Sequence, residues 1–402
     1  MIGLAYCDER GGIFYDARRE PLADGGIVAP ARFEDLVPAP HGTVQMMLPG
    51  RTPLVRTDRP VNGLVLAAVL PSGYTRLLVP AFLRSDGAPE LPLYGYTFAC
   101  VLNDQLHVAA RKTDESEDWR PRYFSPGELE AAIDARLRVD AGNRVLQQVA
   151  LCSREYGCFT AQNVFLVKGE AALPVSPKCN AKCLGCISQL EPEANVPSPQ
   201  RRVAFETSSE ELVRAAIFHL QRVQHGIVSF GQGCEGEPLL RWPTVARAIE
   251  AIRRASPTGT INLNTNGSLP RALQRCIDAG LQAVRISLNS FRPAVYGAYY
   301  RPAGYDLSDV FESVRIASSA GLRVSLNLLT HPGVTDDEQE LLAMDAFLCG
   351  VRIDMIQTRT LNIDPHRYFT AVGRPVRPLG MRYALNRIAE RGVAIGNFTH
   401  TH

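Results

Sequence analysis

No apolar stretch in this sequence approaches the roughly 18 consecutive residues that a membrane-spanning helix needs. The first ten residues lack the basic segment and long apolar run of a secretory signal peptide. Blocks of about five or six like charges are also absent, and the formal net charge is only +2, so the chain gives no strong signal for nucleic-acid binding. These absences predict a cytoplasmic protein without membrane contact.

Length and composition are ordinary for a soluble protein. The chain has 402 residues, of which 46% are hydrophobic, 21% charged and 7% aromatic, and this length suggests two or three domains. In a chain without a targeting signal, the ten cysteines predict reduced thiols or metal ligands rather than disulfides.

Residues 1–120 predict a mainly β N-terminal domain. Short apolar runs alternate with turn residues and no helical pattern intervenes, which favours an antiparallel sheet or small barrel. The pairs that we expect to form hairpins are 3–7 with 13–15, 64–70 with 74–79 across Pro71-Ser72-Gly73, and 94–102 with 105–109.

A helical connector is expected at 121–160. Ser125, Pro126 and Glu128 have the spacing of a capping box with proline at the first helical position, and apolar residues then recur at helical intervals. A second helix is expected over 143–152, after Gly142.

From residue 161 the pattern changes to alternating strands and helices, which is typical of a parallel sheet. Right-handed crossovers between six such units would curl the sheet into an open barrel. We therefore expect an α/β fold with a partial (β/α)6 TIM-like barrel over 161–372, followed by a C-terminal helix and tail over 373–402. The expected strands are 171–177, 226–230, 260–264, 281–288, 322–329 and 351–361, and the expected helices are 207–224, 243–255, 270–279, 308–320, 336–348 and 380–391.

Three thiols lie within eight residues directly after the first barrel strand, at Cys179, Cys183 and Cys186. Thiolates are the usual ligands of iron–sulfur clusters, and a [4Fe–4S] cluster normally takes four, so a loop with three suggests one iron left open for a non-protein ligand. A structural zinc site is the alternative, but it needs a fourth ligand nearby, and the next candidate, His219, is more than thirty residues away.

This Cys-x3-Cys-x2-Cys loop resembles the signature of the radical SAM enzymes, in which it follows the first strand of a partial (β/α) barrel. The resemblance covers roughly residues 165–370. One position departs from it, because Gly185 stands where the family usually has a bulky residue next to the adenine.

The resemblance implies a specific chemistry. A [4Fe–4S] cluster on Cys179, Cys183 and Cys186 would bind S-adenosylmethionine (SAM) at its open iron and, after one-electron reduction, give methionine and a 5′-deoxyadenosyl radical that abstracts hydrogen from a substrate. A flavodoxin-like or ferredoxin-like protein is the implied electron donor.

The ends of the barrel strands supply the candidate cofactor contacts, since parallel barrels form their sites there. After the second strand, Gly236, Glu237 and Pro238 match the family element that binds the amino group of SAM, although Glu235 replaces its usual first glycine. After the third and fourth strands, uncharged polar side chains suit the ribose hydroxyls and the carboxylate of SAM. These candidates are Asn264, Asn266, Ser287 and Asn289.

The sixth strand is dense in polar residues. Alternation would place Gln357 and Arg359 on one interior face, where buried polar groups need partners. A substrate carboxylate or amide is one candidate partner, which would make both residues catalytic-site residues; a structural ion pair is the competing hypothesis.

The remaining cysteines predict no auxiliary cluster. None follows Cys349, so a cysteine-rich C-terminal extension is absent from this sequence. Only two of the four N-terminal cysteines are close in sequence, so buried free thiols are favoured over a second metal site. These four are Cys7, Cys100, Cys152 and Cys158.

Three functions remain open from the sequence. The first is a radical SAM enzyme that modifies a peptide or protein recognised by the N-terminal domain. The second is a small-molecule or cofactor-biosynthesis enzyme resembling the molybdenum-cofactor cyclase class. The third is a non-catalytic iron–sulfur binding or electron-transfer protein. Fold alone does not choose between the first two.

Overall fold

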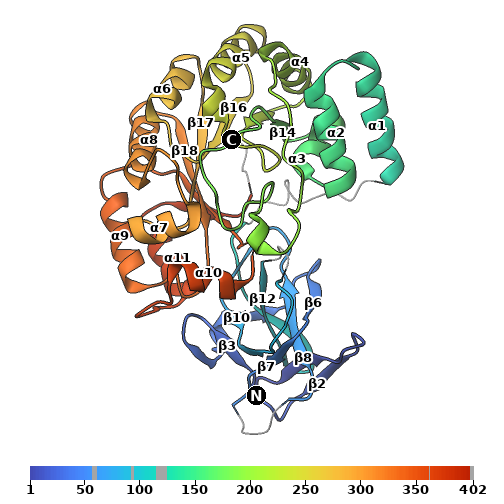
Figure 1. The fold of residues 1–402 in the computed structure, drawn as a ribbon, viewed down its shortest axis with the longest axis vertical. Helices are drawn as coiled ribbons and strands as arrows, with labels where there is room; N and C mark the ends of the chain where they lie inside the picture. The colour runs from blue at the N-terminus through green and yellow to red at the C-terminus, as the bar shows by residue number, and fades with distance from the viewer. Residues whose placement is uncertain (57–60, 92–94, 115–124, 362, 399–402) are drawn as a thin grey trace.

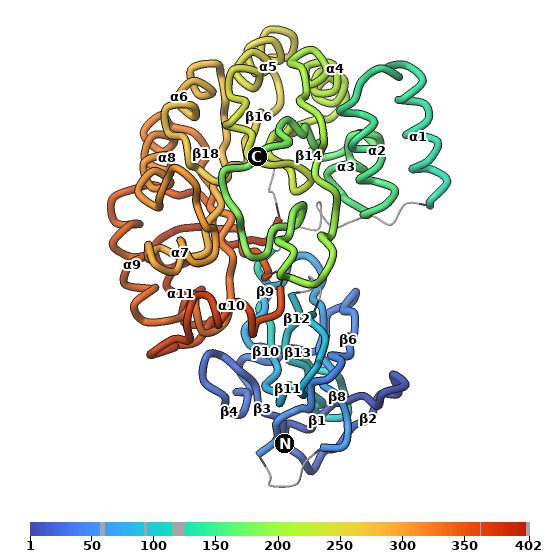
Figure 2. Tube along the Cα trace, in the orientation of Figure 1, coloured from blue at the N-terminus to red at the C-terminus, as the bar shows by residue number. Residues whose placement is uncertain are grey.

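The computed structural model describes residues 1–402 except 57–60, 92–94, 115–124, 362 and 399–402. Figures 1 and 2 show two parts, with antiparallel strands of the N-terminal region at one end and a larger α/β unit at the other. No helix of the described residues is long and apolar enough to cross a membrane.

The N-terminal part is built around an eight-stranded antiparallel sheet with the order β2-β1-β8-β12-β13-β5, to which β6 adds on β8 and β9 on β13. Its strands are β1 (Leu4–Cys7), β2 (Ile13–Asp16), β5 (Leu36–Pro38), β6 (Val44–Leu48), β8 (Leu64–Val69), β9 (Tyr74–Arg76), β12 (Tyr96–Leu102) and β13 (Gln105–Lys112). Two small sheets complete this part, formed by β3 (Leu22–Asp24), β4 (Val28–Pro30) and β10 (Val79–Pro80), and by β7 (Arg51–Pro53) and β11 (Phe82–Arg84).

Two of the three predicted hairpins are present, and one is wrong. Strand β1 pairs with β2 and β12 pairs with β13, as expected, although Tyr94 lies outside the described residues. Strand β9 pairs with β13 rather than with β8. The reason is that β8 already pairs with β6, β1 and β12, which leaves it no place for a further strand.

Three helices connect this sheet to the barrel: α1 (Pro126–Val139), α2 (Arg144–Tyr156) and α3 (Phe159–Leu166). The predicted capping box is formed, because the Ser125 side chain accepts from the Glu128 amide and the Glu128 carboxylate accepts from the Ser125 amide. Helix α2 runs four residues beyond the predicted end at 152, and α3 was not predicted. Ile133, Val149 and Phe165 share one apolar core with the barrel, so these helices pack as part of it.

The α/β unit contains a seven-stranded parallel sheet in sequential order. Its first six strands confirm the six predicted ones, and β20 is an additional strand that the sequence analysis missed. The strands are β14 (Glu170–Leu173), β15 (Ile227–Phe230), β16 (Thr260–Thr265), β17 (Ala283–Leu288), β18 (Arg323–Leu329), β19 (Met355–Arg359) and β20 (Ala394–Gly396). The partial TIM-like barrel fold is therefore confirmed, with one strand more than expected.

Helices cover the outer face of this sheet (Figure 1). Five lie near predicted positions: α4 (Ser209–Leu220), α5 (Trp242–Ala255), α6 (Pro270–Asp278), α8 (Leu307–Ser319) and α9 (Glu338–Leu348). The last predicted helix is α11 (Met381–Glu390), and two short helices, α7 (Pro293–Tyr300) and α10 (Pro365–Val372), were not predicted.

Buried polar contacts join the N-terminal sheet to the barrel. The Arg51 guanidinium donates to the Asp364 carboxylate at the start of α10, and both side chains are fully buried. Arg382 of α11 donates to Asp35 over 3.1 Å. The backbones approach so closely at Gly26, where φ is +97°, that a Cβ there would lie 2.6 Å from the Cα of Gly333. The two parts therefore form a specific, tightly fitted interface.

Candidate active site

A cavity of about 800 Å³ opens at the carboxyl ends of the barrel strands. This volume lies within the range of roughly 300–1,000 Å³ that is usual for small-ligand sites. Residues of β14 and of β16 to β19 line it, together with the loops that follow β14 and β15 and residues of α2 and α3. Ser72 of the N-terminal part and Asn397 and Phe398 after β20 also line it. Figure 2 shows the long segment between β14 and α4 passing across this end of the barrel.

The three cysteines of the loop line this cavity together. Backbone hydrogen bonds to α7 fix the loop, because the amides of Lys182 and Leu184 donate to the carbonyls of Tyr300 and Tyr299, each over 3.0 Å. The rings of Tyr299 and Tyr300 are buried and line the same cavity. Helix α7, which was not predicted, therefore positions the cysteine loop.

Burial keeps two of the three thiols protonated as long as no metal is bound. Burial raises the pKa of Cys179 to about 11 and the pKa of Cys183 well above its usual value, so both are protonated thiols until a metal displaces the proton. Arg202 donates to the Cys186 sulfur over 3.3 Å. Among the described residues no three Cys, His, Asp or Glu side chains converge enough to hold a single metal ion. Three thiols around a cavity wall fit the larger iron–sulfur cluster.

The loop after β15 packs directly against the cysteine loop. The Gly236 amide donates to Ser176 O over 2.7 Å, and the Glu237 amide donates to Lys178 O over 2.8 Å. A Cβ on Gly236 would lie 2.0 Å from that Lys178 oxygen, so only glycine fits here. This contact sets the distance between the first cysteine ligand and Glu237.

Glu235, the departure from the family pattern, has a structural role. Its carboxylate is buried and accepts four backbone N–H groups, two from each of the loops that meet here. Gly231 and Gln232 donate to one oxygen over 2.8 Å each, and Val175 and Ser176 donate to the other over 2.7 and 2.8 Å. The carboxylate thus ties the cysteine loop to the loop after β15, and a glycine could not do this.

Glu237 is buried and lines the cavity. Its carboxylate accepts from Thr265 Oγ1 over 2.6 Å, the Asn266 amide over 2.8 Å and the Leu239 amide over 2.9 Å. A carboxylate has about four acceptor positions, so one remains for a ligand. Burial raises the pKa of Glu237 to about 7, which a bound cation would lower again. The geometry therefore allows Glu237 to accept from an ammonium group.

Three of the four predicted polar residues line the cavity, and Asn289 does not. Asn266 donates to Asn180 Oδ1 over 2.8 Å and so contacts the cysteine loop. Asn289 lies beyond the end of β17, where its side-chain nitrogen donates to Val295 O and to the Tyr368 hydroxyl, each over 3.3 Å. The structure thus places Asn289 away from the cavity wall, and its contact with the cofactor stays a prediction. Asn264 and Ser287 are the other two cavity residues.

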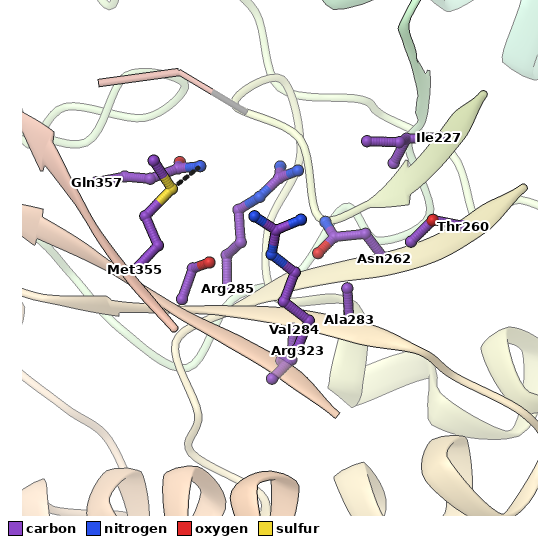
Figure 3. A pocket seen from close by; sticks show the side chains of 10 residues that line it. Ile227, Thr260, Asn262, Ala283, Val284, Arg285, Arg323, Met355 and Gln357 are labelled. Carbon is purple, nitrogen blue, oxygen red and sulfur yellow. Dashed lines mark hydrogen bonds between the residues drawn. The ribbon is translucent and has the colours of Figure 1, made fainter. Parts of the chain in front are cut away.

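The predicted pair on the sixth strand is split between two cavities. Arg359 lines the large cavity, whereas Gln357 lies deeper and lines a separate space of about 20 Å³, which suffices for about one water molecule. Figure 3 shows this small cavity with Gln357, Met355 and Arg285 around it. Gln357 thus lies one strand pleat below Arg359 and does not line the large cavity, and its catalytic role stays a prediction.

The similarity to known proteins lies in the barrel. The family model described as "Radical SAM superfamily" matches residues 173–344, which include the three cysteines and Glu237.

Residues 173–344 belong to the radical SAM superfamily.

Two similar proteins have more specific names. Residues of this radical SAM protein are 32% identical over 185 positions to "Molybdenum cofactor biosynthesis protein 1" of Mus musculus, which covers 46% of this chain and 27% of that protein. They are 33% identical over 171 positions to "GTP 3′,8-cyclase" of Heliobacterium modesticaldum, covering 41% of this chain and 47% of that protein. The chain thus spans less than half the length of either relative.

Among solved structures, a radical SAM methyltransferase from Sphaerobacter thermophilus is similar with a TM-score of 0.41 and 14% identity, over 56% of this chain and 64% of that one. Superfamily membership implies a [4Fe–4S] cluster and SAM as cofactors of this radical SAM protein, and the cavity with its three thiols is consistent with both.

Sequence reasoning missed several residues of the radical SAM cavity. Glu170 and Arg285 point inward from β14 and β17, two residues or more below the strand ends on which the prediction concentrated. A charged residue within an otherwise apolar parallel strand was the available signal. Other missed residues come from segments without a recognisable motif, and they include Ser72, Tyr156, Cys158, Phe159, Thr160, Asn163, Gln200, Tyr299, Tyr300, Asn327, Asn397 and Phe398.

Proposed function

We propose that this protein is a radical SAM enzyme that cleaves SAM reductively and directs the 5′-deoxyadenosyl radical to a hydrogen atom of a substrate held inside the barrel. The observation that supports this most is the common cavity: the three cysteines of the family signature, Glu237 and the polar ends of β16 and β17 all line it. The cluster and SAM would supply the electron transfer and the radical.

The protein residues would hold these groups and exclude water. Cys179, Cys183 and Cys186 would each bind one iron, which leaves one iron for SAM. Glu237 has one acceptor position left for the ammonium group of SAM. Asn264, Asn266 and Ser287 offer uncharged donors and acceptors to the ribose and carboxylate, and Gly236 and Pro238 shape the wall between them.

An external electron donor is required, and a flavodoxin-like or ferredoxin-like protein would fill this role. Cys179, Cys183 and Cys186 are each partly exposed, so a cluster bound there would lie within reach of a docked donor.

A small-molecule substrate, as in cofactor biosynthesis, is one candidate class. It is supported by the sequence similarity to the two relatives above, whose names concern cofactor biosynthesis and a nucleotide cyclase. It is also supported by the cavity, since about 800 Å³ must accommodate the cluster, SAM and the reacting part of the substrate.

A peptide or protein substrate, recognised by residues 1–112, is the second candidate. It is supported by the edge strand β2, where Ile13, Phe14 and Tyr15 are 41%, 44% and 57% exposed. An edge strand offers free backbone groups to an extended chain, and exposed apolar side chains would add contacts. In this case only the end or one side chain of the peptide would enter the cavity.

The test is anaerobic reconstitution of the full-length protein with iron and sulfide. We expect about four irons per chain from the cysteine loop, and essentially none in a variant with Cys179, Cys183 and Cys186 all replaced by alanine. After reduction with dithionite in the presence of SAM, the wild-type protein should release 5′-deoxyadenosine slowly without substrate.

Two outcomes would contradict this function. One zinc ion per chain without iron would mean a zinc site. A complete cluster that never yields 5′-deoxyadenosine with SAM would favour the non-catalytic electron-transfer function.

A further inference from the structure

The inner end of the cavity is lined by charged and amide side chains from successive barrel strands. They are Glu170 on β14, Asn264 on β16, Arg285 on β17, Asn327 on β18 and Arg359 on β19. In the sheet register Asn264 lies beside Arg285, and Ser287, one pleat above Arg285, lies beside Asn327. This polar end lies deeper in the barrel than Glu237 and the cysteines, which are held by loops beyond the strand ends.

One of the two arginines is neutralised within the protein. The Arg285 guanidinium is buried and donates to the Glu170 carboxylate over 2.6 Å and to Asn264 Oδ1 over 3.1 Å. Ser229 donates to the same Glu170 oxygen. Arg285 and Glu170 therefore form a buried ion pair with a fixed orientation.

The other arginine has only uncharged acceptors. Arg359 donates to Asn327 Oδ1 over 3.2 and 3.3 Å, to Gln357 Oε1 over 2.5 Å and to Asn397 O over 2.8 Å. Within the described part of the chain, no salt bridge to Arg359 is formed, so the structural ion pair considered for this residue is not observed. Burial lowers the pKa of Arg359 to about 10, at which the guanidinium still carries its charge at neutral pH.

The wall at this end therefore carries one positive charge in excess. Arg285 and Arg359 contribute two positive charges, and Glu170 contributes one negative charge. The Asp114 carboxylate accepts from the Asn397 amide over 2.9 Å; it acts on Arg359 through its charge but does not line the cavity. A buried charge with only neutral partners is costly unless a ligand neutralises it.

We propose that this inner end binds a carboxylate group of the substrate, with Arg359 as its direct partner; this inference rests on the proposed function and specifies its substrate class. A single excess charge matches a monoanion better than a phosphate dianion. Asn327, Gln357 and Asn397 accept from four of the five N–H groups of Arg359, so one N–H, on Nη1, remains for a carboxylate oxygen, and Asn264 and Asn327 offer amide groups beside it.

The position also sets the orientation of the substrate. The space below Arg285 is the small cavity of about 20 Å³ in Figure 3, which has no room for a ligand larger than water. The carboxylate end would therefore be the inner end, and the carbon that loses hydrogen would lie on the outer side, toward the ribose position at Ser287.

The test uses full-length protein with its cluster reconstituted and SAM bound, and propionate as the probe. Propionamide has almost the same shape without the charge. Calorimetric titration should show propionate binding at least about tenfold more tightly than propionamide, a factor that corresponds to about 1.4 kcal/mol. Equal affinities would overturn the proposal. This comparison uses only the wild-type protein, so it does not depend on whether a variant folds.

The variant Arg359→Gln should lose this preference, so that propionate and propionamide bind alike. Its iron content and its affinity for SAM should stay within about twofold of the wild type. Arg352→Gln is the matched control, because that arginine lies before the same strand with its side chain 71% exposed. It should retain the full propionate preference.

Three further results would refute the assignment. Unchanged propionate binding in Arg359→Gln would mean that this arginine is not the partner. Inorganic phosphate binding more tightly than propionate would assign the site to phosphate esters. A parallel loss of SAM affinity in Arg359→Gln would mean that the arginine holds the carboxylate of SAM. A separate measurement tests the proposed function: if the wild-type protein releases no 5′-deoxyadenosine, that function is wrong, whatever the propionate titration shows.

Discussion

Replacing Asp364 by asparagine should strongly destabilise the attachment of the N-terminal sheet to the barrel. Asp364 and Arg51 form an ion pair in which both side chains are fully buried. Asp364 also caps α10, because its Oδ1 accepts from the His366 amide over 3.1 Å. Asparagine is an equally good capping residue, so Asp364→Asn removes the charge and keeps the cap.

The expected destabilisation follows from the contacts that Arg51 keeps after Asp364 is replaced by asparagine. Nη1 of Arg51 donates to Pro49 O over 2.8 Å and to Pro89 O over 3.0 Å, and the guanidinium lies 5.6 Å from the centre of the Phe82 ring. Arg51 therefore cannot move its charge into water without losing these contacts. Leaving a buried charge without its partner costs about 3–5 kcal/mol.

The assay is urea unfolding of the reconstituted full-length protein, followed in parallel by circular dichroism and intrinsic fluorescence. Two probes are needed because a protein of two parts need not unfold in one step. Asp364→Asn should lower the free energy of unfolding by about 3–5 kcal/mol. The double variant Arg51→Met/Asp364→Asn should recover most of this loss, since neither charge remains.

The outcome that contradicts this reasoning is a small effect. An exposed ion pair contributes less than about 1 kcal/mol to the free energy of unfolding. A loss of that size in Asp364→Asn would therefore mean that water reaches Arg51 in solution. A double variant as unstable as Asp364→Asn would show that packing of the Arg51 side chain, rather than its charge, matters at this interface.

Three further changes test the site. Glu237→Ala should weaken SAM binding by about 2–4 kcal/mol in calorimetry, because a buried ammonium would lose its carboxylate, and unchanged affinity would remove the role assigned to Glu237. Gly236→Ala should lower the iron content after reconstitution, because its Cβ would displace the Lys178 carbonyl, whereas Gly127→Ala, with open space around it, should not. Glu235→Ala should also lower the iron content, since four backbone N–H groups would lose their acceptor; a full cluster in this variant would show that the loops hold without it.

The sequence alone determined the features that depend on local pattern. Cys179, Cys183 and Cys186 are close in the chain, so their spacing is the same before and after folding. The capping box at Ser125 involves residues three positions apart, and it is formed. The alternation of apolar runs and helical periods likewise predicted six strands of the barrel.

Pairing between distant segments was decided by the tertiary structure. Tyr74–Arg76 follows β8 closely in sequence but pairs with β13, because every neighbouring place on β8 is taken by strands from elsewhere. Ala394–Gly396 has only three residues, too few to show a strand pattern, and it becomes a strand because β19 offers it an open edge.

The difference between local pattern and distant pairing also explains why the cofactor side of the site was predictable and its inner end was not. The cofactor side was predictable because its residues belong to short motifs at strand ends. The inner end was not, because the environment of Arg285 and Arg359 depends on Glu170 and Asn397, which come from opposite ends of the barrel domain. Strand alternation correctly placed Arg359 inside the barrel, but depth along the barrel axis is set by the register of all seven strands. Only the folded barrel therefore shows that Gln357 lies below the cavity and Asn289 outside it.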